Sequence, residues 1–228
     1  MKQIKRRNKS HKRDGHNKYK QKLTALEAKT INQKEYIRSI IENDIILCTG
    51  PSGSGKSFIA AGLASRHLHE GLVERIIVTR PLVCTGKDVG SLPGELDEKI
   101  DPYLIPMKEN LKHFLTQAYY GYYSNEGSIQ YKPLELMRGA TFHDSYMILD
   151  EAQNCTVEQI KMFITRMGNN SKVLINGDIN QDDLQGRSGL NFCINKLQNI
   201  EGIGICRLGY EDIQRNGILG RVLNALEN

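Results

Sequence analysis

A glycine-rich loop at residues 50–57 constrains this chain more than any other part of its sequence. It reads Gly50-Pro51-Ser52-Gly53-Ser54-Gly55-Lys56-Ser57, follows the apolar run 45–48 and opens a segment with helical spacing. Glycines let backbone N–H groups converge on phosphate oxygens, and the start of a helix adds a favourable dipole. The pattern predicts a strand, a phosphate-binding loop and a helix. Lys56 would reach the β- and γ-phosphates of a nucleotide, and the Ser57 hydroxyl would bind Mg²⁺.

Short apolar runs predict the fold class. They are 45–48, 76–78, 146–149, 173–175 and the weaker 203–206, and helix-length segments separate them. Continuous apolar runs, rather than alternation, are typical of strands covered on both faces, as in a parallel sheet. We therefore predict a three-layer α/β fold, with a mainly parallel sheet flanked by helices.

Three further segments have a predicted local structure. Residues 31–42 have helical periodicity. Residues 156–167 do too, and they begin with the capping-box residues Thr156 and Gln159. Residues 118–133 contain Tyr119, Tyr120, Tyr122 and Tyr123 before a turn signal, which predicts a β-hairpin. Stacking of these tyrosines on bases is open, but packing against the domain is favoured.

Two carboxylates, Asp150 and Glu151, directly follow the run 146–149. In a chain with a phosphate-binding loop, the first would hold Mg²⁺ at the end of its strand. The second would orient or deprotonate the water that attacks the γ-phosphate. A kinase that phosphorylates a small molecule would not need the adjacent glutamate, so the pair favours hydrolysis.

A third polar motif, Gly177-Asp178-Ile179-Asn180-Gln181, follows the run 173–175. Ligands of open α/β sheets bind at the carboxyl edge, so Gln181 is placed to contact the γ-phosphate or its attacking water. Phosphoryl transfer also builds charge that an arginine can stabilise. The candidates are Arg80, Arg187, Arg215 and Arg221, which the residues alone do not rank.

Positive charge is concentrated in residues 1–22, which contain ten Lys or Arg residues and one acid. The whole chain carries a net charge of +5, so the remainder is acidic. The segment is almost free of apolar residues and is predicted to be a disordered tail. Neutralisation of RNA or single-stranded DNA phosphates is favoured for it; an anionic membrane surface and a merely solubilising role are the alternatives.

The remaining composition points to a reducing cytoplasm. The five cysteines are scattered and odd in number, and no two form a C-x-x-C pair. Nothing at the basic N-terminus resembles a signal peptide, and the apolar runs are too short to span a bilayer. We therefore expect no membrane partner.

Several motifs together resemble the PhoH-like P-loop ATPases. They are Asp150-Glu151-Ala152-Gln153-Asn154, the segment from Arg80-Pro81 to Tyr103-Leu104, Leu136-Met137-Arg138-Gly139-x-Thr141-Phe142, and Lys29-Thr30-x-x-Gln33-x-x-Tyr36. They occur in one order over residues 28–223. The resemblance implies a RecA-like core akin to one domain of superfamily-one helicases. It also implies ATP and Mg²⁺ as ligands, hexameric rings and RNA-related work. The family is linked to phosphate starvation in bacteria and occurs in phages, so the cytoplasm would be the host's for a phage-encoded chain.

The resemblance also assigns roles to individual residues. Gln33 would contact adenine, Gln181 would sense the γ-phosphate and Arg215 would be the arginine finger. We thus expect a tail, 1–22, and a PhoH-like P-loop ATPase domain, 23–228.

Three functions remain open. The first is an ATPase that remodels or translocates on RNA or single-stranded DNA, and the second is a nucleotide-gated nucleic-acid-binding protein with little turnover. The third is a small-molecule kinase. Helicases of this type place the nucleotide between two RecA-like domains, and this chain has room for one. The first function therefore predicts a homo-oligomer.

Overall fold

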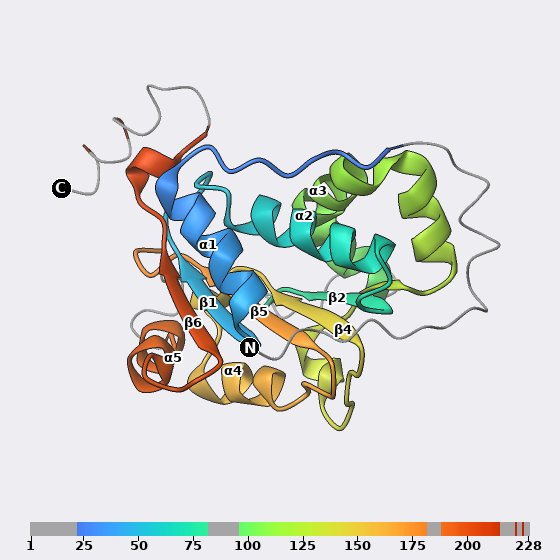
Figure 1. Ribbon diagram of the computed structural model, residues 1–228. Coiled ribbons are helices and arrows are strands. Elements are labelled where there is room, and N and C mark those ends of the chain that lie inside the picture. The colour runs from blue at the N-terminus through green and yellow to red at the C-terminus, as the bar shows by residue number, and fades with distance from the viewer. Residues whose placement is uncertain (1–21, 82–95, 182–187, 215–221, 223–224, 226–228) are drawn as a thin grey trace.

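The computed structural model describes residues 22–81, 96–181 and 188–214, together with Val222 and Ala225 (Figure 1). Its helices are α1 (Ile31–Glu42), α2 (Lys56–His69), α3 (Leu96–Asn125), α4 (Val157–Ile164) and α5 (Leu190–Leu197). Its strands are β1 (Ile45–Thr49), β2 (Arg75–Thr79), β3 (Ile129–Tyr131), β4 (Ser145–Leu149), β5 (Lys172–Gly177) and β6 (Ile203–Arg207). Short 3₁₀ helices are η3 (Leu134–Met137), η4 (Ala152–Asn154) and η5 (Tyr210–Asp212).

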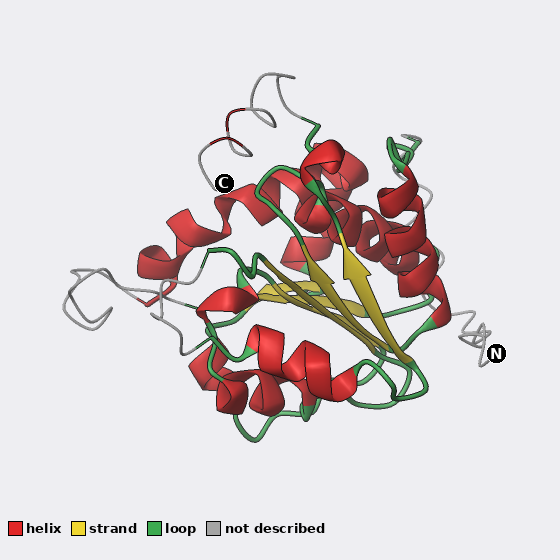
Figure 2. Ribbon diagram, turned by 90° about the vertical axis from the view of Figure 1, so that its left-hand side faces the viewer, coloured by secondary structure: helices red, strands yellow, loops and turns green. Residues whose placement is uncertain are grey.

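The described strands form one parallel sheet in the order β3-β2-β4-β5-β1-β6. Helices α1, α2 and α3 lie on one face of it, and α4 and α5 on the other (Figures 1 and 2). This confirms the predicted three-layer α/β class, and the arrangement is the RecA-like one of P-loop NTPases. Strand β5 lies between β1, which precedes the phosphate loop, and β4, which precedes Asp150.

Two hydrophobic clusters explain the continuous apolar runs. Ile46 and Cys48 belong to the cluster under α1, α2 and α3, whereas Leu47, between them in β1, belongs to the cluster over α4 and α5. Strand β5 does the same, with Leu174 in the first cluster and Ile175 in the second. Successive side chains point to opposite faces, and both faces are covered, so adjacent positions in these runs are apolar.

The predicted helix 156–167 is confirmed at its start and ends earlier than predicted. Thr156 is the N-cap and forms the full capping box with Gln159. The helix stops at Ile164, and Met167 instead forms a parallel bridge with Phe142. That bridge draws the chain toward the sheet before the apolar periodicity has ended.

The predicted hairpin over residues 118–133 is wrong. The tyrosines lie in the last turns of α3, and β3 pairs in parallel with β2 at the edge of the sheet. The turn signal closes a helix rather than a hairpin, with Gly127 at a φ of +69°. The packing role is confirmed for Tyr119 and Tyr123, which are buried.

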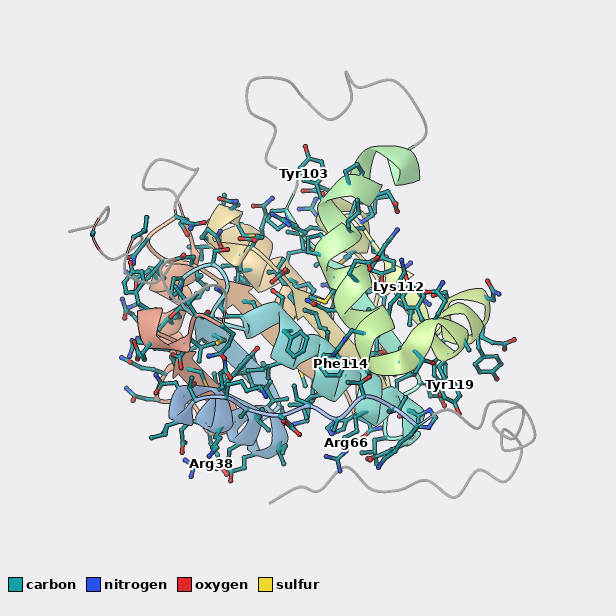
Figure 3. All side chains as sticks on the ribbon, turned by 90° about the horizontal axis from the view of Figure 1, so that it is seen from above. Arg38, Arg66, Tyr103, Lys112, Phe114 and Tyr119 are labelled. Atoms are coloured by element: carbon teal, nitrogen blue, oxygen red, sulfur yellow. The ribbon has the colours of Figure 1, made fainter. Side chains whose placement is uncertain are left out.

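Helix α3 also covers α2. Phe114, labelled in Figure 3, packs against Phe58 of α2 with ring centroids 4.6 Å apart.

Of the helices in the described ranges, none is long and apolar enough to cross a membrane.

Candidate active site

The carboxyl ends of four neighbouring strands meet at one edge of the sheet. The Gly50 amide, after β1, donates a 3.2 Å hydrogen bond to the Gly177 carbonyl at the end of β5. The Asp150 amide, after β4, donates a 3.0 Å hydrogen bond to the Thr79 carbonyl at the end of β2. The loop after β1 and the acidic pair after β4 therefore share an edge, as parallel strands require.

The loop backbone depends on its glycines. Gly50 and Gly55 have φ values of +155° and +100°. A Cβ at Gly50 would lie 2.5 Å from the Leu208 carbonyl oxygen, and one at Gly55 would lie 3.0 Å from the Gln33 amide nitrogen. The loop is thus in close contact with the segment after β6 and with α1. A side chain at Gly50 or Gly55 would displace the loop from these neighbours.

Lys56 begins α2, and its ammonium group turns back over the loop. The Nζ atom donates hydrogen bonds to the Gly50 carbonyl and, at 3.0 Å, to the Pro51 carbonyl. Carbonyl oxygens thus hold the positive charge at the loop, where phosphate oxygens could replace them as acceptors.

Ser57 and Asp150 are in direct contact. The serine hydroxyl donates a 2.7 Å hydrogen bond to the aspartate Oδ1. Burial, and next the charge of Glu151, raises the pKa of the Asp150 carboxyl. A hydroxyl and a carboxylate are hard oxygen donors of the kind Mg²⁺ takes, alongside water and phosphate, so the pair fits that ion. No group of three or more His, Cys, Asp or Glu residues in the described ranges could hold a metal.

Glu151 has both carboxylate oxygens engaged. Oε1 lies 3.4 Å from an Arg80 guanidinium nitrogen, and Oε2 accepts a 2.7 Å hydrogen bond from Gln153 Nε2. The residue has a left-handed backbone, with φ +57° and ψ +41°, which costs a non-glycine residue on the order of 1 kcal/mol. A carboxylate held this way keeps one orientation at the sheet edge.

Gln153 links this carboxylate to the third motif. It is 2 % exposed, and its Oε1 accepts a 3.0 Å hydrogen bond from the Asp178 amide. The sequence predicts no role for this amide, although it stands within the acidic motif quoted above. Arg80 is predicted only as a possible arginine finger, and its guanidinium instead pairs with Glu151.

Gln33 of α1 lies against the phosphate loop. Its Nε2 donates to the Ser54 carbonyl at 2.9 Å, and its Oε1 accepts from the Lys29 amide at 2.8 Å. The structure therefore brings Gln33 to the loop, while its contact with adenine stays a prediction. The Asp212 carbonyl accepts a 3.3 Å hydrogen bond from Gln33 Nε2, and the sequence predicts no role for this aspartate.

Of the remaining predicted site residues, the structure describes Gln181. Gln181 is exposed, and its backbone N–H donates a 3.1 Å hydrogen bond to the Asp178 carbonyl. Arg215, Arg187 and Arg221 lie outside the described residues, as do most of the predicted tail and segment 82–95.

The chain is similar to known proteins in sequence and in fold. The family model described as "PhoH-like protein" matches residues 25–227. The PhoH-like proteins of Synechocystis sp. and Bacillus subtilis are each 40 % identical to this chain over 89 % of its length and 62 % and 64 % of theirs. Protein PhoH of Escherichia coli K12 is 40 % identical over 85 % of this chain and 56 % of its own.

The chain thus spans about three fifths of the length of these relatives. Among solved structures, the large terminase of a thermophilic bacteriophage matches with a TM-score of 0.53 at 11 % identity, over 86 % of this chain and 49 % of that one. That likeness concerns the fold alone. The family model covers nearly the whole chain, and from that match and the three relatives we conclude that the chain belongs to the PhoH-like family.

Proposed function

We propose that this chain binds ATP with Mg²⁺ and hydrolyses its β–γ phosphoanhydride bond. The observation that carries the proposal is the 2.7 Å hydrogen bond between Ser57 and Asp150, beside the restrained carboxylate of Glu151. It joins the end of a phosphate-binding loop to a buried carboxylate, and a potential base is the next residue. A nucleotide triphosphate, a divalent cation and a water molecule are the reactants that such a site would hold.

Each group then has a task. The loop amides and Lys56 would bind the phosphates, and Ser57 and Asp150 would hold Mg²⁺, which neutralises charge on the β- and γ-phosphates when bound. Glu151 would accept a proton as a water oxygen bonds to the γ-phosphorus and the bond to the β-phosphate oxygen breaks. ADP and phosphate are the products. Gln181 and Arg215 are proposed, from the family resemblance, to contact the γ-phosphate and its developing charge.

We also propose that turnover is coupled to binding of RNA or single-stranded DNA. Residues 1–22 carry ten basic residues and one acidic residue, which suits contact with nucleic-acid phosphates. A homo-oligomer is also part of the proposal: a neighbouring copy would complete the nucleotide site, and the family resemblance implies a hexameric ring. The proposed location is a reducing cytoplasm.

The experiment is Mg²⁺-dependent ATP hydrolysis by the full chain, with and without single-stranded RNA or DNA. Lys56→Ala is the blank. Stimulation by nucleic acid that disappears in the blank supports a nucleic-acid-coupled ATPase. Absence of ATP hydrolysis in every condition contradicts the hydrolytic function.

A second function is a nucleotide-gated nucleic-acid-binding protein with little turnover. The observation in its favour is that Arg80 and Gln153 together engage both oxygens of Glu151. ATP that binds tightly, alters nucleic-acid affinity and is not hydrolysed would select this function over the first.

Neutralising positive charges in the tail, residues 1–22, is expected to weaken nucleic-acid binding and to make the affinity less dependent on salt. In the triple variant Arg6→Gln, Arg7→Gln and Lys12→Gln, three phosphate neutralisations are lost. The slope of log K against log salt for single-stranded RNA should fall by about 2, because each contact contributes about 0.7. Fluorescence anisotropy at several salt concentrations measures this slope.

The matched control removes three charges from the body of the protein, with Lys34→Gln, Lys161→Gln and Lys196→Gln. All three side chains are exposed. Its slope should stay at the wild-type value. An equal decrease in both triple variants would show that net charge, rather than the tail, determines binding.

Gln153→Met is expected to lower the kcat for ATP about tenfold to hundredfold while nucleotide affinity is retained. The variant keeps the side-chain length, but it removes the donor to Glu151 and the acceptor for the Asp178 amide. A small misplacement of a catalytic group costs rates of this size. Gln130→Met is the control, because its amide donates to the Gly127 carbonyl on the exposed surface. A kcat equal in both variants would refute the positioning role.

A further inference from the structure

A carboxylate at the edge of the candidate site is completely buried, and its hydrogen-bond donors within the described part of the chain include no cation. Asp212, in η5, is 0 % exposed. Its Oδ1 accepts from the Thr30 hydroxyl, and its Oδ2 accepts from the Asn32 amide at 2.9 Å and the Gly209 backbone N–H at 2.6 Å. All three donors are neutral. Burying a charge is costly even when its hydrogen bonds are satisfied, so this arrangement calls for an explanation.

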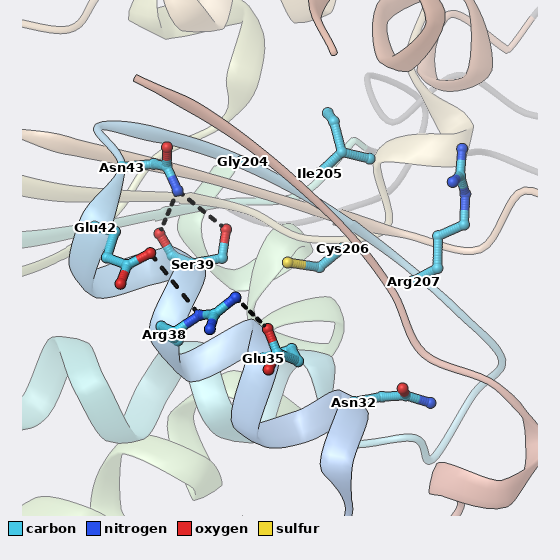
Figure 4. Close-up of a pocket in the computed structure, with 10 residues that line it drawn as sticks. All are labelled: Asn32, Glu35, Arg38, Ser39, Glu42, Asn43, Gly204, Ile205, Cys206 and Arg207. Atoms are coloured by element: carbon cyan, nitrogen blue, oxygen red, sulfur yellow. Dashed lines mark hydrogen bonds and ion pairs between the residues drawn. The ribbon is translucent and has the colours of Figure 1, made fainter. Parts of the chain in front are cut away.

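Part of the explanation is the start of α1. That helix is capped by Thr30 and has no acidic residue in its first turn. Asp212 supplies a negative charge, which stabilises a helix N-terminus. It lies 182 residues after Thr30 in the sequence. Asn32 lines a cavity of about 290 Å³ between α1 and β6 (Figure 4). Its side-chain Nδ2 also donates a 2.9 Å hydrogen bond to Glu211 Oε1. The segment after β6 is thereby fastened to the first turn of α1.

Asp212 also fixes Gln33. The Thr30 hydroxyl that donates to the carboxylate accepts a 3.2 Å hydrogen bond from the Gln33 backbone amide. The Asp212 carbonyl accepts a 3.3 Å hydrogen bond from Gln33 Nε2, which also donates to the Ser54 carbonyl. Backbone and side chain of Gln33 are therefore both held by the same aspartate.

Three main-chain groups set the direction of the Gln33 side-chain amide, and one of them is the Asp212 carbonyl, which the carboxylate of the same residue holds against α1. Both hydrogens of Nε2 are used by the Ser54 and Asp212 carbonyls, whereas Oε1 accepts from Lys29 and retains a second lone pair. A base that meets this amide would meet an acceptor. Adenine presents an amino donor at its six position and guanine presents a carbonyl acceptor there, so a fixed acceptor favours adenine. An amide free to rotate by 180° could serve either base.

We propose that Asp212 is a specificity-determining positioning residue, which selects ATP over GTP by holding Gln33 in one orientation against the phosphate loop. The inference rests on the proposed ATPase function and deepens it. It assigns Asp212 no contact with the nucleotide, so its effect appears in discrimination between bases rather than in the chemical step.

The test measures kcat/KM for ATP and for GTP with the full chain and with Asp212→Asn. The amide that this change introduces has only one acceptor oxygen, so its NH2 group must face either the Thr30 hydroxyl or the two N–H donors, and at least one hydrogen bond that now attaches α1 is lost. The ATP-to-GTP ratio of the wild type should be tenfold or more and should fall about tenfold in the variant, mainly through the KM for ATP. Gln33→Ala should lose the preference as well, and the double variant should lose no more than Gln33→Ala alone.

Three further variants keep the test decisive. Thr30→Val leaves Asp212 in place but removes the hydroxyl between it and Gln33, and it should lower the ratio, whereas Thr30→Ser should restore it. Glu201→Gln is the matched control, since this exposed carboxylate before β6 takes no part in the attachment of η5 to α1, and it should leave the ratio unchanged.

The outcomes separate this inference from the proposed function. A wild-type chain without ATPase activity refutes the proposed function. An active wild-type chain that lacks base preference, or whose ratio survives Asp212→Asn and Thr30→Val, refutes the role of Asp212 alone. Equal losses of kcat/KM for ATP and GTP in both variants would reduce Asp212 to a structural residue and overturn the inference.

Discussion

Lys56→Ala is expected to raise the dissociation constant of this protein for ATP about a hundredfold. Hydrogen bonds to charged groups are worth roughly 1.5–3 kcal/mol each, and about 1.4 kcal/mol corresponds to a factor of ten in affinity. An ammonium that bridges two phosphates makes at least two such bonds. In the structure, carbonyl oxygens of Gly50 and Pro51 already hold the group at the loop, so little rearrangement opposes phosphate binding. Isothermal titration calorimetry with ATP and Mg²⁺ measures the change.

The control for this variant is Lys161→Ala, which removes an exposed lysine from α4 on the other face of the sheet. It should bind ATP with the wild-type dissociation constant. Lys56→Ala should also keep a melting temperature near that of the wild type, because the lost bonds are local to the loop. ATP affinity within about threefold of the wild type would contradict the assignment of the phosphate site to residues 50–57.

Much of the sheet edge could be predicted from the sequence, because the relevant signals are local. Five of the six described strands show as short apolar runs, and the phosphate loop, the acidic pair and the third motif each follow a run directly. Parallel pairing then places the ends of the runs together without further information. The contact between Ser57 and Asp150 follows from this rule, although 93 residues separate them. The roles proposed for these residues remain predictions.

The parts that could not be predicted depend on contacts between distant segments. Asp212 reads in the sequence as a surface charge, since charged residues are rarely buried completely. Its burial depends on Thr30, far away along the chain, and no local pattern encodes that pairing. The hairpin prediction failed for a related reason. The turn at 124–127 is compatible with a helix end or a hairpin, and pairing of β3 with β2, rather than the turn itself, decides between them.

Glu151→Gln is expected to lower the kcat for ATP hydrolysis by about two to three orders of magnitude, the range that general-base catalysis contributes. The amide is nearly isosteric with the carboxylate but accepts no proton at neutral pH. The glutamine side chain also loses the ion pair with Arg80. Its NH2 group must then face a donor, either the Arg80 guanidinium or Gln153 Nε2. Single-turnover hydrolysis of radiolabelled ATP measures the rate.

Binding of ATP should survive this change, and the reason lies in Asp150. The charge of Glu151 is one of the causes that raise the pKa of the Asp150 carboxyl, so neutralising the glutamate lowers that pKa. A lower pKa favours the carboxylate form of Asp150, the form that would bind Mg²⁺ and the nucleotide with it. The dissociation constant for ATP should therefore equal or fall below the wild-type value.

The control is Glu158→Gln, which neutralises an exposed glutamate in the first turn of α4 and should leave hydrolysis unchanged. A Glu151→Gln protein that binds ATP and nucleic acid but hydrolyses nothing would separate binding from turnover, and it would show that the chain needs hydrolysis for any remodelling that the wild type performs. Loss of ATP binding in parallel with kcat would instead make Glu151 a structural residue. Hydrolysis at the wild-type rate would exclude it as the base and leave the attacking water to be oriented by another group, with Gln181 as the next to test.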